Sequence, residues 1–136
     1  MPAGYSQKPL AEKLGIKAGS KIVFLNAPKD YAATLGELPA TARVCKRLCP
    51  LLDFIQFFSR SQQDLQKQFP TLKSSLAANG SLWISWPKGA SKLETDLNEN
   101  VVRSIGLEHG LVDVKVCAVD ETWSGLKFVI RLGDRK

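Results

Sequence analysis

The sequence predicts an α/β fold with a mainly parallel sheet and an antiparallel C-terminal strand. Short apolar segments alternate with helical patterns along most of the 136 residues, which is typical of a sheet covered by helices on both faces. The segment at 20–26 is continuously apolar at its centre, as expected of a strand buried on both faces in a parallel sheet. The last two, at 111–119 and 126–132, are separated by a link too short for a parallel crossover, so they form an antiparallel hairpin.

The first fifty residues are predicted to contain a short helix, a strand, a helical turn and a weaker strand, at residues 6–14, 20–26, 28–35 and 42–46. Ser6 can cap the helix, Pro9 suits its first turn and Gly15 suits its end. The first strand, SKIVFLN, follows Gly19 and is short, apolar and β-branched at its centre.

The middle of the chain predicts a strand at 51–59, then a helix, then the strand SLWISW. Ser61 and Asp64 have the spacing of a capping box at the start of that helix. A helical stripe, bent at Pro70, is formed by Leu65, Phe69, Leu72 and Leu76. Asn79-Gly80 is a turn signal before the next strand.

The last helix is predicted to run from Asp96 to about His109. Asp96 forms a capping pattern with Glu99, and Gly110 ends the helix. One face of this helix carries Leu97, Val101 and Ile105. In the hairpin that follows, one face carries Val112, Val114 and Val116. Centring the hairpin on residue 122 places residue 113 opposite residue 131, which predicts a favourable Asp–Arg cross-strand pair.

Composition indicates one domain that can bury a sizeable core without a metal or disulfide. The odd number of cysteines and the absence of a signal-peptide pattern or long apolar run predict a cytoplasmic protein with no membrane partner. Residues 1–50 carry +5 of the net charge of +6. A basic segment can attract phosphates, so weak, non-specific nucleic-acid binding through Lys13, Lys17 and Lys21 is one expectation. The other is that the lysines only keep the domain in solution.

The order of these elements resembles the core of the S-adenosylmethionine-dependent methyltransferases. LGIKAGSKIVFLNAP is similar to the entry to their first strand, and LDFIQFF with LKSSLAANGSLWISWP is similar to their central strands and helix. Through KPLAEKLGIKAGSKI, LNAPKDY, WISWPK and VDVKVCAVDETWSGLKFV, the chain also resembles a small family of bacterial proteins of unknown function with this Rossmann-like core. The resemblance implies a methyltransferase-like Rossmann sandwich formed by one domain over residues 1–136.

The chain departs from the methyltransferase pattern at three places. Asn26-Ala27-Pro28 stand where those enzymes have a glycine-rich loop, and no G-x-G occurs in the chain. In those enzymes the second strand ends in an acidic residue that holds the cofactor ribose. The matching segment here, VCKRLC, contains no carboxylate. The chain then passes directly to LLDFIQFF, so the domain is expected to lack one strand–helix unit. We therefore expect no S-adenosylmethionine in the usual pose, and no other cofactor.

Two apolar segments end in Pro-Lys, at residues 28–29 and 87–88, where the predicted parallel strands have just ended. Right-handed crossovers place the carboxyl ends of such strands at one edge of the sheet, where open α/β sheets bind ligands. The candidate ligand-binding residues at this edge are Asn26, Lys29, Trp86, Lys88 and Trp123. An indole wall, an amide and two ammonium groups would suit an anionic small molecule. The alternative is that both tryptophans are packing residues and the lysines are solvated.

Other polar residues give weaker indications. Cys45 and Cys49 have C-x-x-x-C spacing, but zinc sites need more ligands and His109 is the only histidine, so no metal site is predicted. Asp120 and Glu121 can be an acid–base pair or an ordinary polar turn.

Three functions remain open from the sequence. The first is small-ligand or partner binding on a degenerate methyltransferase-like scaffold without standard S-adenosylmethionine chemistry. The second is an enzyme of the transferase class that uses the carboxyl-edge cleft. The third is a weak nucleic-acid-binding accessory protein. The residues do not identify the ligand, catalytic residues, oligomeric state or pathway.

Overall fold

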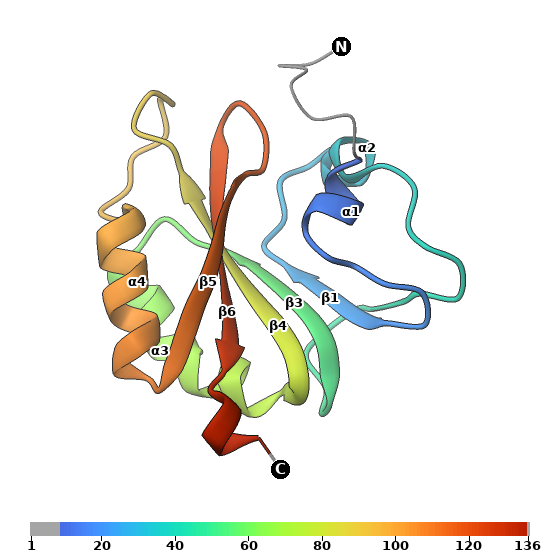
Figure 1. The fold of residues 1–136 in the computed structure, drawn as a ribbon. Coiled ribbons are helices and arrows are strands. Elements are labelled where there is room, and N and C mark those ends of the chain that lie inside the picture. The colour runs from blue at the N-terminus through green and yellow to red at the C-terminus, as the bar shows by residue number, and fades with distance from the viewer. Residues whose placement is uncertain (1–8, 136) are drawn as a thin grey trace.

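A computed structural model describes residues 9–135, so the expected cap at Ser6 lies outside the described part. One six-stranded sheet separates two helical layers (Figure 1). In chain order, the helices and strands are α1 (Leu10–Lys13), β1 (Lys21–Leu25), α2 (Tyr31–Leu35), β2 (Arg43–Cys45), β3 (Leu52–Phe58), α3 (Gln62–Ser74), β4 (Leu76–Pro87), α4 (Glu99–Glu108), β5 (Leu111–Ala118) and β6 (Trp123–Ile130), followed by a 3-10 turn (Leu132–Asp134). Within residues 9–135, no helix is both long and apolar enough to cross a bilayer.

The strand order is β2-β1-β3-β4-β6-β5. The first four strands in that order pair in parallel, and β6 lies antiparallel to both β4 and β5. This arrangement confirms the predicted fold class. Residues 46–51 join β2 directly to β3 without a further helix or strand.

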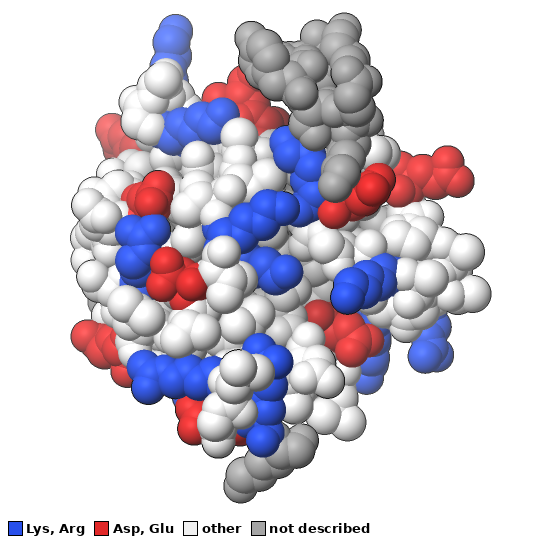
Figure 2. Space-filling model, viewed as in Figure 1, with Lys and Arg blue, Asp and Glu red and all other residues white. Residues whose placement is uncertain are grey.

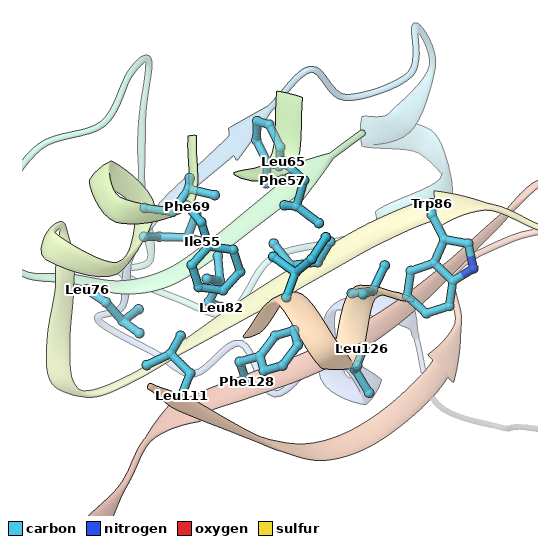
Figure 3. Close-up of a cluster of buried hydrophobic side chains, with 14 of the residues drawn as sticks. Ile55, Phe57, Leu65, Phe69, Leu76, Leu82, Trp86, Leu111, Leu126 and Phe128 are labelled. Carbon is cyan, nitrogen blue, oxygen red and sulfur yellow. The ribbon is translucent and has the colours of Figure 1, made fainter. Parts of the chain in front are cut away.

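The core has two parts because the sheet is covered on both faces. Between the sheet and α3 and α4 lies a cluster that includes Ile55, Phe69, Leu82 and Phe128, all fully buried (Figure 3). The opposite cluster packs under α1 and α2 and contains Trp83, whose indole nitrogen donates to the Leu14 carbonyl at 2.9 Å. Burying each large apolar side chain stabilises the fold by about 1.5–3 kcal/mol.

The two long helices have side-chain caps, but only one was predicted correctly. Ser61 Oγ accepts the Asp64 amide at 3.1 Å, which confirms the cap of α3. At α4 the cap is Asn98, whose Oδ1 accepts the Val101 amide at 2.9 Å, so the expected pattern starting at Asp96 is wrong. Asp96 instead accepts the Gln62 amide at 2.8 Å and so holds the start of α3.

Strand boundaries differ from the prediction at two further places. β4 begins at Leu76, which was expected in the helix, and runs through Asn79-Gly80, where its register with β3 shifts. Gly80 lies inside the strand, and the position requires glycine because a Cβ there would approach the Leu52 carbonyl to 2.7 Å. A glycine required by close packing therefore resembled a turn signal in the sequence.

The terminal hairpin turns earlier than predicted. Asp120 Oδ1 accepts the amides of Thr122 and Trp123, so β6 begins at Trp123 rather than 126. Asp113 consequently lies opposite Phe128, and the expected pair with Arg131 does not form. Asp113 instead pairs with Arg103 of α4 at 2.8 Å. A register shift after Asp113 also breaks the expected valine face, and the side chains at 114 and 116 are exposed.

Candidate functional site

A groove of about 470 Å³ lies where the strand order reverses. The chain passes from β1 to its neighbour β2 on one side, and then returns to β3 on the other side of β1. The carboxyl ends of β1 and β3 therefore flank a topological switch point. Open α/β sheets bind ligands at this place. Asn26, which follows β1, lines one side, and residues 58–61, at the end of β3, line the other. The groove is open to solvent, and Asp64, Leu93 and Trp123 complete its lining.

Aromatic and apolar side chains form part of the groove. Trp123 is half-buried and meets the ring of the buried Phe58 edge-on, with the ring centroids 5.2 Å apart. The backbone of Trp123 is fixed by its pairing with Pro87 at the end of β4 and by the Asp120 carboxylate. Leu93 leaves 37% of its surface exposed. A flat ligand could therefore be covered by the exposed part of the indole and by Leu93.

Polar groups line the rest of the groove, but several are already engaged. Asn26 has φ = 59° and donates from Nδ2 to the Phe58 carbonyl at 3.3 Å, so it ties the ends of β1 and β3 together. Ser59 Oγ accepts the Ser61 amide at 3.2 Å. Arg60 and Asp64 contribute opposite charges, which leaves the lining close to electrically balanced. Because Asp96 and Ser61 already accept amides of the first turn of α3, this helix end has reduced capacity for an added anion.

A buried chain of hydrogen bonds lies in the sheet beside the groove. The Tyr31 hydroxyl donates to Gln56 Oε1 at 2.6 Å, and Gln56 Nε2 donates to Ser85 Oγ at 3.0 Å. Gln56 and Ser85 are fully buried, and Tyr31 is 5% exposed. Burial raises the pKa of Tyr31 well above its usual value, so the hydroxyl remains protonated at neutral pH. The chain links α2, β3 and β4 through satisfied polar groups.

The five predicted site residues do not all meet. Asn26 and Trp123 line the groove together. Trp86 is 5% exposed and packs in the cluster beneath α3 and α4, on the other face of the sheet (Figure 3). Lys88 is half-buried and its amide donates to the Thr122 carbonyl at 2.7 Å, while Lys29 is exposed. Neither lysine lines the groove. Ligand binding by any of the five remains a prediction.

Sequence reasoning missed most of the groove and the buried chain. The polar segment Ser59–Ser61 directly follows an apolar strand, a signal for the carboxyl edge that could have been used. Gln56 is a single amide inside the apolar run FIQFF, so its need for a buried partner was also visible. Nothing in the local sequence connects Asp64 or Leu93 with the end of β1.

The other polar candidates contact neighbouring residues of the protein. Cys45 and Cys49 are free thiols with their Sγ atoms 3.7 Å apart, and no group of three potential metal ligands occurs among residues 9–135. His109 stacks on Phe69 at 4.7 Å, and its Nε2 lies 2.9 Å from Gln66 Oε1. Asp120 holds the hairpin turn through its two amide contacts, as the polar-turn alternative expected.

Comparisons with known proteins point to one fold. No protein-family model and no curated protein matches the chain. Among solved structures, a SAM-dependent methyltransferase from Aquifex aeolicus matches with a TM-score of 0.62 and 15% identity, over 88% of this chain and 87% of that one. The chain has the methyltransferase fold. A TehB-like SAM-dependent methyltransferase from Corynebacterium glutamicum matches with a TM-score of 0.60 and 12% identity, over 95% and 91% of the two chains. The Methanococcus jannaschii fibrillarin pre-rRNA processing protein gives 0.58 and 12%, over 89% and 73%.

Proposed function

We propose that this protein binds a small organic ligand in the switch-point groove, without S-adenosylmethionine in its usual pose. The observation that carries the proposal is the position of the groove at the ends of β1 and β3, where α/β sheets bind ligands. Its lining combines a half-buried indole with amide, hydroxyl and oppositely charged groups, the mixture typical of small-ligand pockets. Lys29 and Lys88 lie beyond the ends of β1 and β4 but do not line the groove, so their contact with an anionic ligand stays a prediction.

Two local features support the part of the proposal that concerns the cofactor. The loop after β1 carries the Asn26 side chain, bonded to the end of β3, where the methyltransferases that the chain resembles have glycines. The segment that ends β2, Arg43–Cys45, and residues 46–49 after it contain no carboxylate for ribose hydroxyls. The direct link between β2 and β3 supports a single domain that lacks one strand–helix unit.

An enzyme of the transferase class is the second candidate. The methyltransferase fold favours it, because solved methyltransferases share this arrangement at low identity. Under this alternative the groove would hold a reacting substrate rather than a ligand alone. Release of S-adenosylhomocysteine from S-adenosylmethionine, in the presence of small-molecule or RNA acceptors, would favour the enzyme over the binding protein.

The test is a thermal-shift screen with nucleotides, adenosyl cofactors and sugar phosphates, followed by calorimetry. A ligand present at about 100 times its dissociation constant should stabilise the fold by about 2.7 kcal/mol. Arg60→Ala should weaken the binding of any such compound, whereas Arg131→Ala, which removes an exposed arginine outside the groove, should not. Micromolar binding of S-adenosylmethionine would refute the cofactor part, and equal effects of the two arginine variants would refute the groove.

A further inference from the structure

Four lysines from separate parts of the chain lie on one surface, which we call the lysine surface. Lys13 ends α1, Lys17 follows in the loop before β1, Lys115 lies in β5 and Lys127 lies in β6. On the side turned to the viewer, Figure 2 shows Lys and Arg atoms near the centre of the face, over β6 and toward α1, with Asp and Glu atoms on either side. The lysine surface is distinct from the groove, whose lining contains none of these residues.

Specific contacts place Lys115 and Lys127 beside the end of α1. Lys115 Nζ donates to the Lys13 carbonyl at 3.0 Å, so the end of α1 anchors the β5 side chain. Lys127 Nζ lies 3.6 Å from the position that a Cβ would occupy on Gly15, just after the same helix. Lys115 and Lys127 are direct cross-strand partners. Two β-strands therefore place the ammonium groups of Lys115 and Lys127 beside the end of α1. Lys13 belongs to that helix end, and the charge of Lys17 acts on Lys127.

This arrangement is electrostatically unfavourable for the protein alone. Like charges directly opposite each other on neighbouring strands destabilise a sheet. Burial, together with the charges of Lys115 and Lys17, lowers the pKa of Lys127. Within residues 9–135, ion pairs are confined to Arg103, which contacts Glu99 and Asp113, so none of the four lysines is neutralised by a carboxylate there. An external anion would relieve this repulsion.

We propose that the lysine surface binds the phosphate backbone of a nucleic acid. Four ammonium groups spread over three segments can make several phosphate contacts, and each contact releases counterions. Lysine binds phosphate as a point charge, and phosphate contacts carry no sequence information. A surface defined by four lysines therefore binds independently of base sequence. This inference replaces the expected set of Lys13, Lys17 and Lys21. Lys21 lies in β1, where its ammonium donates to the Pro50 carbonyl at 2.9 Å.

The position of Lys21 makes it a matched control. β1 is separated from β6 by β3 and β4 in the sheet, so Lys21→Glu makes the same charge change as the single variant Lys127→Glu but on another strand. The test variant is Lys115→Glu with Lys127→Glu, and Lys127→Glu alone serves as a folding control. Because Lys127→Glu replaces a like-charge pair with an opposite-charge pair, its melting temperature should equal or exceed that of the unchanged protein.

The experiment is fluorescence anisotropy with labelled oligouridine and with a labelled DNA duplex, at several salt concentrations. For oligouridine, four contacts predict a slope of log K against log salt of about −3, which the double variant should reduce to about −1.4. The double variant should also weaken binding more than tenfold, and Lys127→Glu should weaken binding without lowering the melting temperature. The single Lys21→Glu control should retain the full salt slope.

Three results would overturn the proposal. The first is no binding to either nucleic acid at low salt. The second is that Lys21→Glu and Lys127→Glu lose equal amounts of binding and of slope, which would indicate net charge rather than a surface. The third is lysine-dependent sedimentation with phosphatidylserine vesicles in the absence of nucleic-acid binding. All three are independent of whether a ligand binds in the groove, because no groove residue is changed.

Discussion

Replacing Tyr31 with phenylalanine removes one hydroxyl from the buried chain and leaves the ring in place. Tyr31 donates at 2.6 Å to Gln56 Oε1, which has no other donor among the described hydrogen bonds. The variant therefore buries an unsatisfied carbonyl oxygen. Such a group costs about 1–3 kcal/mol. At neutral pH, Tyr31→Phe should lower the free energy of unfolding by that amount.

High pH should reduce this difference. The pKa of Tyr31 is raised in the folded protein, mainly by burial, whereas an unfolded tyrosine ionises near pH 10. Stabilisation from a group with a raised folded pKa is complete below the unfolded pKa and falls as pH increases above it. The unchanged protein should lose about 1.4 kcal/mol for each pH unit above about 10 from this group. Tyr31→Phe has no such loss.

Urea denaturation of both proteins at neutral pH and near pH 11, followed by circular dichroism, measures the two effects together. Deprotonation of the lysines affects both proteins, so their difference isolates Tyr31. We expect the difference in unfolding free energy to shrink by about 1.4 kcal/mol between the two conditions. Equal stabilities at neutral pH, or a difference that does not change with pH, would contradict the buried hydrogen bond.

Two further predictions concern packing. Gly106→Ala should destabilise the protein by about 1–2 kcal/mol, because a Cβ there would clash with the buried Phe128 ring and overpacking outweighs the helix-propensity gain of about 1 kcal/mol. Ser104→Ala, on the exposed side of the same helix, should be neutral or slightly stabilising in the same denaturation experiment. Trp86→Ala should cost about 3–5 kcal/mol as a core residue, and Lys88→Ala should leave the melting temperature unchanged. Similar stabilities for these last two variants would show that Trp86 is not a core residue.

The fold could be predicted because its signals are local. The short, mostly apolar segments Lys21–Leu25 and Leu52–Phe58 mark central strands, and Ser61 is placed as a cap by its spacing from Asp64. Details that depend on tertiary contacts could not be predicted. Asp113 could pair with a residue on a neighbouring strand or on α4, and only the observed register and the approach of Arg103 decide between them.

The candidate site was harder to predict for the same reason. Its position at the carboxyl edge follows from topology, but which face of a strand end borders the groove depends on where α1, α2, α3 and α4 pack. Trp86 and Trp123 both lie near that edge, yet Trp86 faces the core beneath α3 and α4 while Trp123 borders the groove. The alternation of side chains along a strand shows which residues share a face of the sheet. It does not specify which of the two faces is open to solvent at the strand end.

The most direct test of the groove is a ¹H–¹⁵N NMR titration of the protein with the panel of nucleotides, adenosyl cofactors and sugar phosphates. At least one compound should shift the amide resonances of Asn26, Ser59 and Ser61 and the indole resonance of Trp123. The indole resonances of the buried Trp83 and Trp86 should stay in place. S-adenosylmethionine should not produce these shifts at micromolar concentration. Shifts confined to other surfaces, or saturation of the groove by micromolar S-adenosylmethionine, would contradict the account.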